Sequence, residues 1–337
     1  MTSRQGAYIF GCAGERLLAS EAAFFKNANP WGFILFARNI DNPDQLRRLT
    51  DDLRAAVGRD AVVTIDQEGG RVERMTPPHW RHWLPPLDQV ATNPHYAERG
   101  MYLRYRIIAD ELRRVGIDSN CSPCADVATP ETHAVLLNRC YSDDPMKVAS
   151  VSRSVANGLL DGGVLPVLKH IPGHGRGTLD SHLELPRVSA KRADLDSVDF
   201  AAMKALADLP LGMSAHIVYE DIDPNRPATT SLIMTQVIRE EIGFGGLLMT
   251  DDLSMEALDG DVTDRTRASL AAGMDLILHC NGEIPEMEAV ADAAGEFAPD
   301  AQSRADAALN MRKSPDNVDI QALETELVAL LDGRAHG

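Results

Sequence analysis

Val164-Leu165-Pro166-Val167-Leu168 leads without a break into Lys169-His170-Ile171-Pro172-Gly173-His174-Gly175, and Asp180-Ser181-His182 follows shortly after. The first five residues form a short apolar run of the kind that makes a buried strand. The glycines that follow predict a loop. A lysine, three histidines and an aspartate so close together are costly to bury without partners. The stretch therefore predicts a buried strand that delivers a Lys-His pair to its carboxyl end, and a loop that carries an Asp-x-His pair.

Short apolar runs of the same kind recur along the whole chain. The other runs are Tyr8–Cys12, Phe33–Phe36, Ala61–Ile65, Ile117–Cys121, Leu211–Ala215, Leu247–Thr250 and Leu276–Cys280. They are mostly apolar rather than alternating, as in parallel strands that are covered on both faces. Segments with helical spacing lie between them, among them Pro94–Val115, Pro145–Leu160, Ser231–Ile242 and Thr263–Ala272. About eight strands, each followed by helix, predict an α/β fold of the (β/α)₈ type, with an open doubly wound sheet as the alternative.

Length and composition agree with one such barrel. The chain has 337 residues, of which 44% are hydrophobic, enough for a large core. After Cys280 the sequence is helical and polar, which predicts the last barrel helix and helical additions. We therefore expect residues 1–337 to form a single barrel domain with helical C-terminal additions.

Charge and cysteine content restrict the class of protein. The formal net charge of −17 disfavours nucleic-acid binding, which needs a basic surface. The N-terminus has no apolar segment of signal-peptide length, and no run reaches the roughly 18 apolar residues of a membrane span. Five widely spaced cysteines do not form a disulfide framework and suit a reducing compartment. We expect a cytoplasmic monomer. Its expected partner is a small molecule, and we expect it to bind neither nucleic acid nor membranes.

Charged residues or histidines follow six of the predicted strands. They are Asp66, Asp126, Lys169 with His170, His216, Asp251 with Asp252, and His279. Barrel enzymes carry their chemistry at the carboxyl ends of the strands, and all of these residues fall at that end. The distribution predicts an active site there.

Taken singly, these residues also have structural interpretations. His216 and His279 suit core histidines with satisfied hydrogen bonds, and Asp251-Asp252 suits the cap of a following helix. Cys121-Ser122-Pro123-Cys124 matches half of a zinc or redox motif, but the chain offers no second pair at metal spacing. Their convergence on one end of the barrel favours a functional site.

Four segments occur in an order that is typical of one enzyme family. They are Asp66-Gln67-Glu68-Gly69-Gly70-Arg71-Val72, Asn138-Arg139-Cys140-Tyr141-Ser142-Asp143-Asp144-Pro145, Lys169 to Gly175 with Asp180-Ser181-His182, and Thr250-Asp251-Asp252-Leu253-Ser254-Met255. In these segments the chain resembles glycoside hydrolase family 3. Within that family it resembles the bacterial cytoplasmic β-N-acetylglucosaminidases (β-N-acetylhexosaminidases) of peptidoglycan recycling. One departure is Ile171, where the family more often has an aromatic residue.

The resemblance implies a retaining glycoside hydrolase that works through a covalent glycosyl-enzyme. Asp251 resembles the nucleophile, His182 the general acid/base, and Asp180 the residue that orients His182. The residues that resemble the binding site for the N-acetylglucosamine ring are Asp66, Arg74, Arg139, Lys169 and His170. The implied substrate is an N-acetylglucosamine-terminated muropeptide, and the implied reaction needs neither a cofactor nor a metal.

The implied roles agree with the chemistry of the residue types. Histidine exchanges protons near neutral pH because its unperturbed pKa is about 6.5, and a nearby aspartate can fix its tautomer. The glycines at positions 173, 175 and 177 would let the loop fold over a bound sugar and open again.

Three other functions remain open from the sequence. A metal-dependent amidohydrolase would use His170, His216, His279 and Asp251 as ligands. A phosphorylase would share the covalent step and pass the sugar to phosphate. A sugar sensor would need the binding residues but would have no use for Asp251, Asp180 and His182 together.

Overall fold

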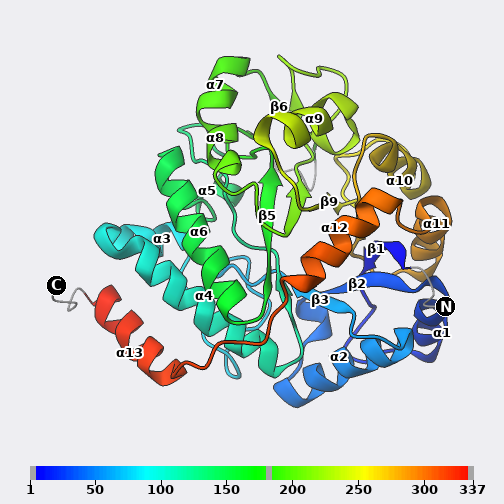
Figure 1. Ribbon diagram of the computed structural model, residues 1–337, viewed down its shortest axis with the longest axis horizontal. Coiled ribbons are helices and arrows are strands. Elements are labelled where there is room, and N and C mark those ends of the chain that lie inside the picture. The colour runs from blue at the N-terminus through cyan, green and yellow to red at the C-terminus, as the bar shows by residue number, and fades with distance from the viewer. Residues whose placement is uncertain (1–4, 180–183, 333–337) are drawn as a thin grey trace.

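The computed structural model describes residues 5–179 and 184–332. Within these residues, eight parallel strands close into a barrel in the order β1-β10-β9-β7-β5-β4-β3-β2 (Figure 1). The strands are β1 (Gly6–Phe10), β2 (Pro30–Leu35), β3 (Val62–Ile65), β4 (Ser119–Asn120), β5 (Leu165–Ile171), β7 (Leu211–Ser214), β9 (Leu247–Asp252) and β10 (Leu276–His279). Strand β1 pairs with both β2 and β10, so the sheet has no free edge. This closure excludes the open doubly wound sheet.

Helices follow the barrel strands and pack around them. They are α1 (Ala19–Ala28), α2 (Pro43–Val57), α3 (Pro86–Thr92), α4 (Ala97–Arg114), α5 (Ala134–Leu137), α6 (Pro145–Asp161), α7 (Arg192–Ser197), α8 (Asp199–Lys204), α9 (Leu232–Gln236), α10 (Val262–Ala271) and α11 (Ile284–Ala294). Short turns η1 (Ala37–Asn39), η2 (Pro94–Tyr96) and η3 (Ala228–Thr230) precede some of them. The prediction of a (β/α)₈ barrel is confirmed.

The ends of the helices follow the local signals in the sequence. Helix α6 begins at Pro145, and the side chain of Asp144 accepts a hydrogen bond from the Met146 N–H. The predicted helix Ser231–Ile242 is capped by the Ser231 side chain and ends at Gly243, whose φ is 81°. Its second half, η4 (Val237–Ile242), is π-helical, which the spacing of apolar residues alone did not predict.

Two strands extend further than the sequence predicted. We expected them to end at Leu168 and Thr250, but β5 continues to Ile171 and β9 to Asp252. Their neighbours extend the ladder, because Ile171 pairs with Ser214 and Asp252 with Leu278. The polar residues at these positions therefore lie on hydrogen-bonded strands rather than on loops.

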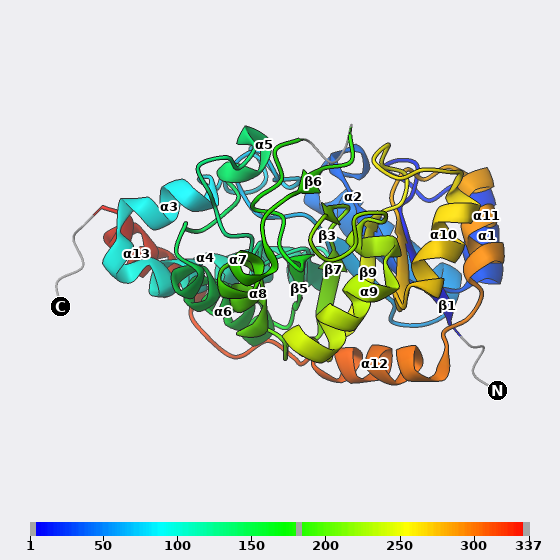
Figure 2. The ribbon, with the colours of Figure 1, turned by 90° about the horizontal axis from the view of Figure 1, so that it is seen from above.

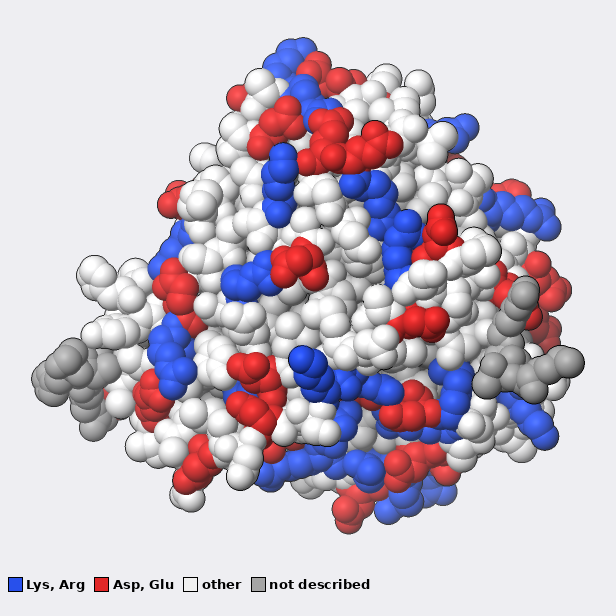
Figure 3. Space-filling model, in the orientation of Figure 1, with Lys and Arg blue, Asp and Glu red and all other residues white. Residues whose placement is uncertain are grey.

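The two ends of the barrel differ. Helix α12 (Pro299–Asn310) crosses the amino-terminal end, where Ala301, Ala305 and Ala308 pack on the first residues of the strands (Figures 1 and 2). Acidic and basic side chains are mixed on this face, without a large patch of either sign (Figure 3). Helix α13 (Ile320–Leu331) packs against α4 on the outside. The opposite end, at the carboxyl termini of the strands, contains a pocket and the small sheet of β6 (Arg187–Val188) and β8 (Val218–Tyr219).

No helix within residues 5–179 and 184–332 is both long enough and apolar enough to cross a bilayer.

Candidate active site

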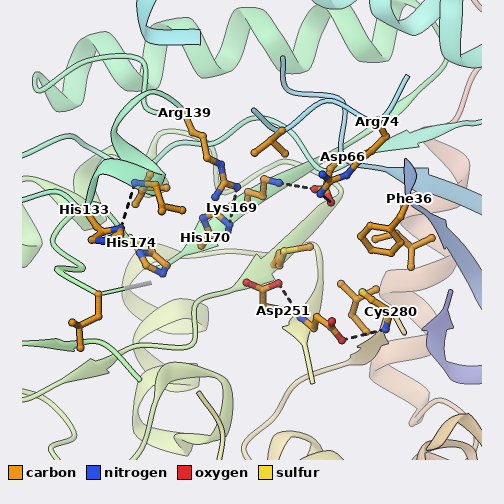
Figure 4. Close-up of a pocket in the computed structure, with 18 residues that line it drawn as sticks. Phe36, Asp66, Arg74, His133, Arg139, Lys169, His170, His174, Asp251 and Cys280 are labelled. Carbon is orange, nitrogen blue, oxygen red and sulfur yellow. Dashed lines mark hydrogen bonds and ion pairs between the residues drawn. The ribbon is translucent and has the colours of Figure 1, made fainter. Parts of the chain in front are cut away.

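A pocket lies at the carboxyl ends of the strands (Figure 4). Its floor is the top of the apolar barrel interior, formed by Ile34, Met213 and Leu278. Its volume is about 140 Å³. A cavity of roughly 150 Å³ accommodates benzene, so this pocket has room for one six-membered ring.

Carboxylates and cations alternate along one wall of the pocket. Lys169 Nζ lies 2.9 Å from Asp66 Oδ1 and 2.6 Å from Glu68 Oε1. Arg74 Nη2 lies 3.2 Å from Asp66 Oδ2. Arg139 donates two hydrogen bonds to Glu68, at 2.9 and 2.8 Å. The five residues predicted to bind a sugar, Asp66, Arg74, Arg139, Lys169 and His170, thus line one pocket.

This pairing decides the charge state of the wall. Burial alone would raise the pKa of Asp66, but the cations of Lys169 and Arg74 hold it well below its usual range. Burial opposes the ionisation of Glu68 as well, yet Arg139 and Lys169 lower its pKa to about 2. The two carboxylates in turn outweigh the burial of Lys169 and raise its pKa. The wall therefore presents fixed charges to a ligand at neutral pH.

His170 is held from below by a buried aspartate. Its Nδ1 lies 2.7 Å from Oδ2 of Asp126, which is fully buried. The carboxylate can only accept, so Nδ1 carries the proton, and Nε2 lies 3.4 Å from Arg139 Nη2. Asp126 also accepts from the backbone N–H of His174, whose side-chain pKa burial lowers to about 4. The arrangement fixes the orientation of the His170 ring at the pocket.

Asp251 lies across the pocket from this wall (Figure 4). Its Oδ1 accepts a hydrogen bond from the Asp252 N–H at 2.8 Å. Burial raises the pKa of Asp251, but the nearby imidazoles of His216 and His170 outweigh it and keep the pKa below its ordinary value. Asp251 is therefore an ionised carboxylate that faces the pocket from a rigid strand.

The neighbouring Asp252 is used differently. Its carboxylate accepts from the N–H and the hydroxyl of Ser254, at 3.0 and 2.6 Å, and from the Cys280 N–H at 3.1 Å. These bonds fasten the end of β9 to the segment after β10. Both aspartates line the pocket, but only the carboxylate of Asp252 is occupied by several hydrogen bonds within the protein.

The other two predicted strand-end histidines lie in the core. His216 is fully buried, with Nε2 3.1 Å from the Asp252 carbonyl oxygen and Nδ1 2.7 Å from Thr229 Oγ1. Burial lowers its pKa. His279 is also fully buried, and its ring lies edge-on to Phe10 at 6.5 Å between centroids. His216 matches the structural interpretation. His279 also lies in the core, with Nε2 3.4 Å from Glu286 Oε2, but within the described part of the chain its ring nitrogens do not make the satisfied hydrogen bonds that this interpretation expects. Neither histidine lines the pocket.

The ligand set of an amidohydrolase is not assembled. Among residues 5–179 and 184–332, the one group of three potential ligands within 4.8 Å is Cys124, Asp126 and His170. Asp126 already accepts bonds from Cys124, His170 and His174. The predicted ligands His170, His216, His279 and Asp251 do not form such a group, so the geometry argues against that alternative.

Asp180 and His182 lie outside the described residues, so their positions are not part of this geometry. The segment before them is anchored beside the pocket. The hydroxyl of Thr132 donates to the Gly175 carbonyl at 2.6 Å, and Arg176 Nε lies 2.7 Å from buried Asp199. Leu179, the residue before Asp180, lines the pocket.

The sequence interpretation assigned no individual role to two residues of the site. It included Glu68 only as part of a motif segment, and Asp126 only as one of the charged residues that follow a predicted strand. A signal existed for both, since each is an acid close to the end of a buried strand. Their partners come from other strands, and only the closed barrel shows which they are.

Comparisons with known proteins support a single family. The glycosyl hydrolase family 3 N terminal domain matches residues 14–309. A β-hexosaminidase of Alkalilimnicola ehrlichii is 34% identical over 284 residues, 82% of this chain and 81% of that protein. NagZ of Neisseria gonorrhoeae, solved with N-trifluoroacetyl-D-glucosamine, has a TM-score of 0.84 at 29% identity and covers 98% of this chain and 97% of its own.

A second solved structure has the same fold. The family 3 β-N-acetylglucosaminidase of Paenibacillus sp. has a TM-score of 0.87 at 26% identity, and the match covers 97% of this chain and 67% of that one. The family match extends over most of the sequence, and it includes Asp66, directly after β3, and the strands that carry Lys169 and Asp251. The chain belongs to glycoside hydrolase family 3.

Proposed function

We propose that this chain is a retaining β-N-acetylhexosaminidase that removes non-reducing terminal β-linked N-acetylglucosamine by double displacement. The observation that carries the proposal is the ring-sized pocket, in which ionised Asp251 faces the Asp66, Lys169 and His170 wall. Retaining glycosidases need a nucleophile on one side of the anomeric carbon and a proton donor near the leaving oxygen. The curated relatives are β-hexosaminidases, which agrees with this activity.

Asp251 is the nucleophile of the proposed reaction. Its carboxylate attacks the anomeric carbon, and the bond from that carbon to the leaving oxygen breaks. His182 donates the proton that the leaving oxygen needs, with Asp180 orienting its ring. In the second step His182 takes a proton from water, which attacks the same carbon and releases Asp251. Two inversions at one carbon return the β-anomer.

The opposite wall binds the sugar. The carboxylate of Asp66 accepts from hydroxyl groups, and Arg74, Arg139 and Lys169 donate to sugar oxygens. His170 presents Nε2 to the pocket because Asp126 holds Nδ1. These contacts orient the ring so that its anomeric carbon meets Asp251.

The proposed natural substrate is a cell-wall-derived anhydro-muropeptide with a terminal N-acetylglucosamine. Similarity to NagZ of Neisseria gonorrhoeae over nearly the whole of both chains supports a shared substrate class. We also propose that residues 1–337 form a single catalytic domain, which works as a monomer in the cytoplasm. The five cysteines are free and buried, which suits a reducing compartment.

Hydrolysis of para-nitrophenyl N-acetyl-β-glucosaminide, compared with the β-glucoside, tests this function. We expect strong preference for the N-acetylglucosaminide and a β-anomer as the first product in proton NMR. Preference for the glucoside would overturn the substrate, and an α-anomer would overturn retention.

Two further arms of the same assay address the alternatives. We expect full activity after EDTA treatment, whereas an amidohydrolase would lose it. Added phosphate should yield no sugar 1-phosphate, since its formation would show phosphorolysis.

A further inference from the structure

Glu68 lies directly behind the wall that is proposed to bind the sugar. Its side chain is 1% exposed and does not line the pocket. Its carboxylate lies 2.6 Å from Lys169 Nζ and accepts two hydrogen bonds from Arg139. Glu68 therefore contacts two residues that face the ligand, without facing the ligand itself.

The two cations reach Glu68 from different parts of the fold. Lys169 is on the rigid strand β5, whereas Arg139 lies between α5 and α6, outside the barrel strands. The paired bonds to Glu68 fix the plane of the Arg139 guanidinium, because a planar fork matches a carboxylate in one orientation. Glu68 thus ties a cation from outside the barrel strands to one on a strand.

Glu68 also balances charge on both cations: among the described residues it is the ion-pair partner of Arg139, and it shares Lys169 with Asp66. Lys169 is 2% exposed and has two carboxylate partners, Glu68 and Asp66. Asp66 is shared with Arg74 and is itself proposed to bind the sugar. Without the charge of Glu68, the ammonium of Lys169 would depend on Asp66 and on Asp251, whose pKa it already lowers.

We propose that Glu68 is a positioning residue for the sugar-binding cations, and that it also limits their electrostatic effect on Asp251. The inference rests on the proposed function of the pocket. Glu68 acts through Lys169 and Arg139, so it affects binding and the charge around Asp251 without touching the substrate.

The variant Glu68→Gln tests this role because its shape is nearly unchanged. The amide places an N–H group against donors, so Lys169 or Arg139 must shift. A misplacement of about 1 Å can cost 10²-fold, and we expect kcat/KM for the aryl N-acetylglucosaminide to fall by about 10²-fold. Most of the loss should appear in KM, because the cations hold the sugar before and during the reaction. Inhibition by free N-acetylglucosamine should weaken in parallel.

The pH profile separates positioning from a purely structural role. One more net positive charge beside Asp251 lowers its pKa, so the acid limb of kcat/KM should move to lower pH in Glu68→Gln. Glu68→Asp keeps the charge on a shorter side chain. It should restore the wild-type acid limb while recovering only part of kcat/KM.

Glu73→Gln is the matched control. Glu73 belongs to the same loop, its side chain is 2% exposed, and its carboxylate holds His82 and the Trp83 N–H at 2.9 and 3.0 Å. Neither partner lines the pocket. This variant should lose thermal stability but keep kcat/KM and the acid limb of the wild type.

The outcomes distinguish the inference from the function on which it rests. If Glu68→Gln matches Glu73→Gln in both kcat/KM and pH profile, Glu68 is structural and the inference fails. If Glu68→Gln does not fold, the kcat/KM of Glu68→Asp tests the inference instead. A wild-type value of kcat/KM in Glu68→Asp would overturn the positioning role. If the wild-type protein itself does not hydrolyse the aryl N-acetylglucosaminide, the proposed function fails first.

Discussion

Asp251 and Asp252 are neighbours on β9, and replacing each by alanine should affect a different property of the protein. Asp251 faces the pocket and accepts one hydrogen bond, from the adjacent backbone N–H. Asp252 accepts three, from two groups of Ser254 and from the Cys280 N–H. We therefore expect Asp251→Ala to abolish activity and Asp252→Ala to lower stability.

The structure sets the size of each effect. Hydrogen bonds to a charged group contribute roughly 1.5–3 kcal/mol each and do not simply add. Because Asp252 is half-buried, we expect Asp252→Ala to lower the free energy of unfolding by about 3 kcal/mol. Asp251→Ala should lower it by about 1.5 kcal/mol, the lower end of that range, since one local bond is lost. Loss of a residue that forms the covalent intermediate should lower kcat by about 10⁴- to 10⁶-fold, or roughly 5–8 kcal/mol.

Thermal unfolding and hydrolysis of an activated aryl N-acetylglucosaminide measure both effects. Azide adds a positive test, because it fits the space that Asp251→Ala leaves. The azide should attack the anomeric carbon and displace the aryloxide, so that an α-glycosyl azide forms with one inversion. Asp251→Ala with activity within tenfold of wild type would refute the assignment. Full stability of an inactive Asp252→Ala variant would exchange the roles of the two residues.

Three further predictions follow from the site. Lys169→Met should lower the free energy of unfolding by about 3–5 kcal/mol near neutral pH, because it leaves Asp66 and Glu68 buried without the ammonium. Their pKa values are held low in the wild type, so this pairing stabilises fully above about pH 4 and is lost as the pH falls toward 2. The difference in unfolding free energy from wild type should therefore shrink between about pH 4 and 2 in urea titrations. A constant difference would contradict the pairing. Burial raises the pKa of Asp199 to about 6, and Arg176 opposes the rise. A carboxyl with a raised pKa favours the folded state at low pH and lowers its stability as the pH rises through that pKa. Arg176→Met should therefore lower Tm more at pH 8 than at pH 5. Equal losses of Tm at the two pH values would argue against the Arg176–Asp199 ion pair. His182→Ala should impair substrates with poor leaving groups far more than activated aryl substrates, and equal impairment would mean that His182 is not the proton donor.

Much of the fold could be predicted because barrel strands have a local signal. Buried parallel strands are continuous apolar runs, and each of the eight runs overlaps a barrel strand. The signals that mark the helix ends are also local, as the caps Asp144 and Ser231 and the terminating Gly243 illustrate. The π-helical half of Ser231–Ile242 was not predicted, because its apolar spacing fits an α-helix nearly as well.

The candidate site was predictable in part. Asp66, Lys169 and Asp251 follow strands that a barrel brings together at one end, so their meeting followed from the fold class. The same rule also selected His216 and His279, which lie in the core. A rule about strand ends places a residue near the pocket but does not say which way its side chain points.

The sequence by itself determined the strand-helix repeat and the set of acids, cations and histidines at the carboxyl ends, because periodicity and residue type are local properties. Only the tertiary structure decided that, of two aspartates that both line the pocket, Asp252 fastens β9 to the segment after β10, whereas Asp251 accepts a single local hydrogen bond. Only the tertiary structure decided, too, that Glu68 joins Lys169 to Arg139. The physical reason is that each of these pairings joins residues far apart in the chain. Their distances depend on how the closed barrel sets the register of its strands and where the connecting segments lie.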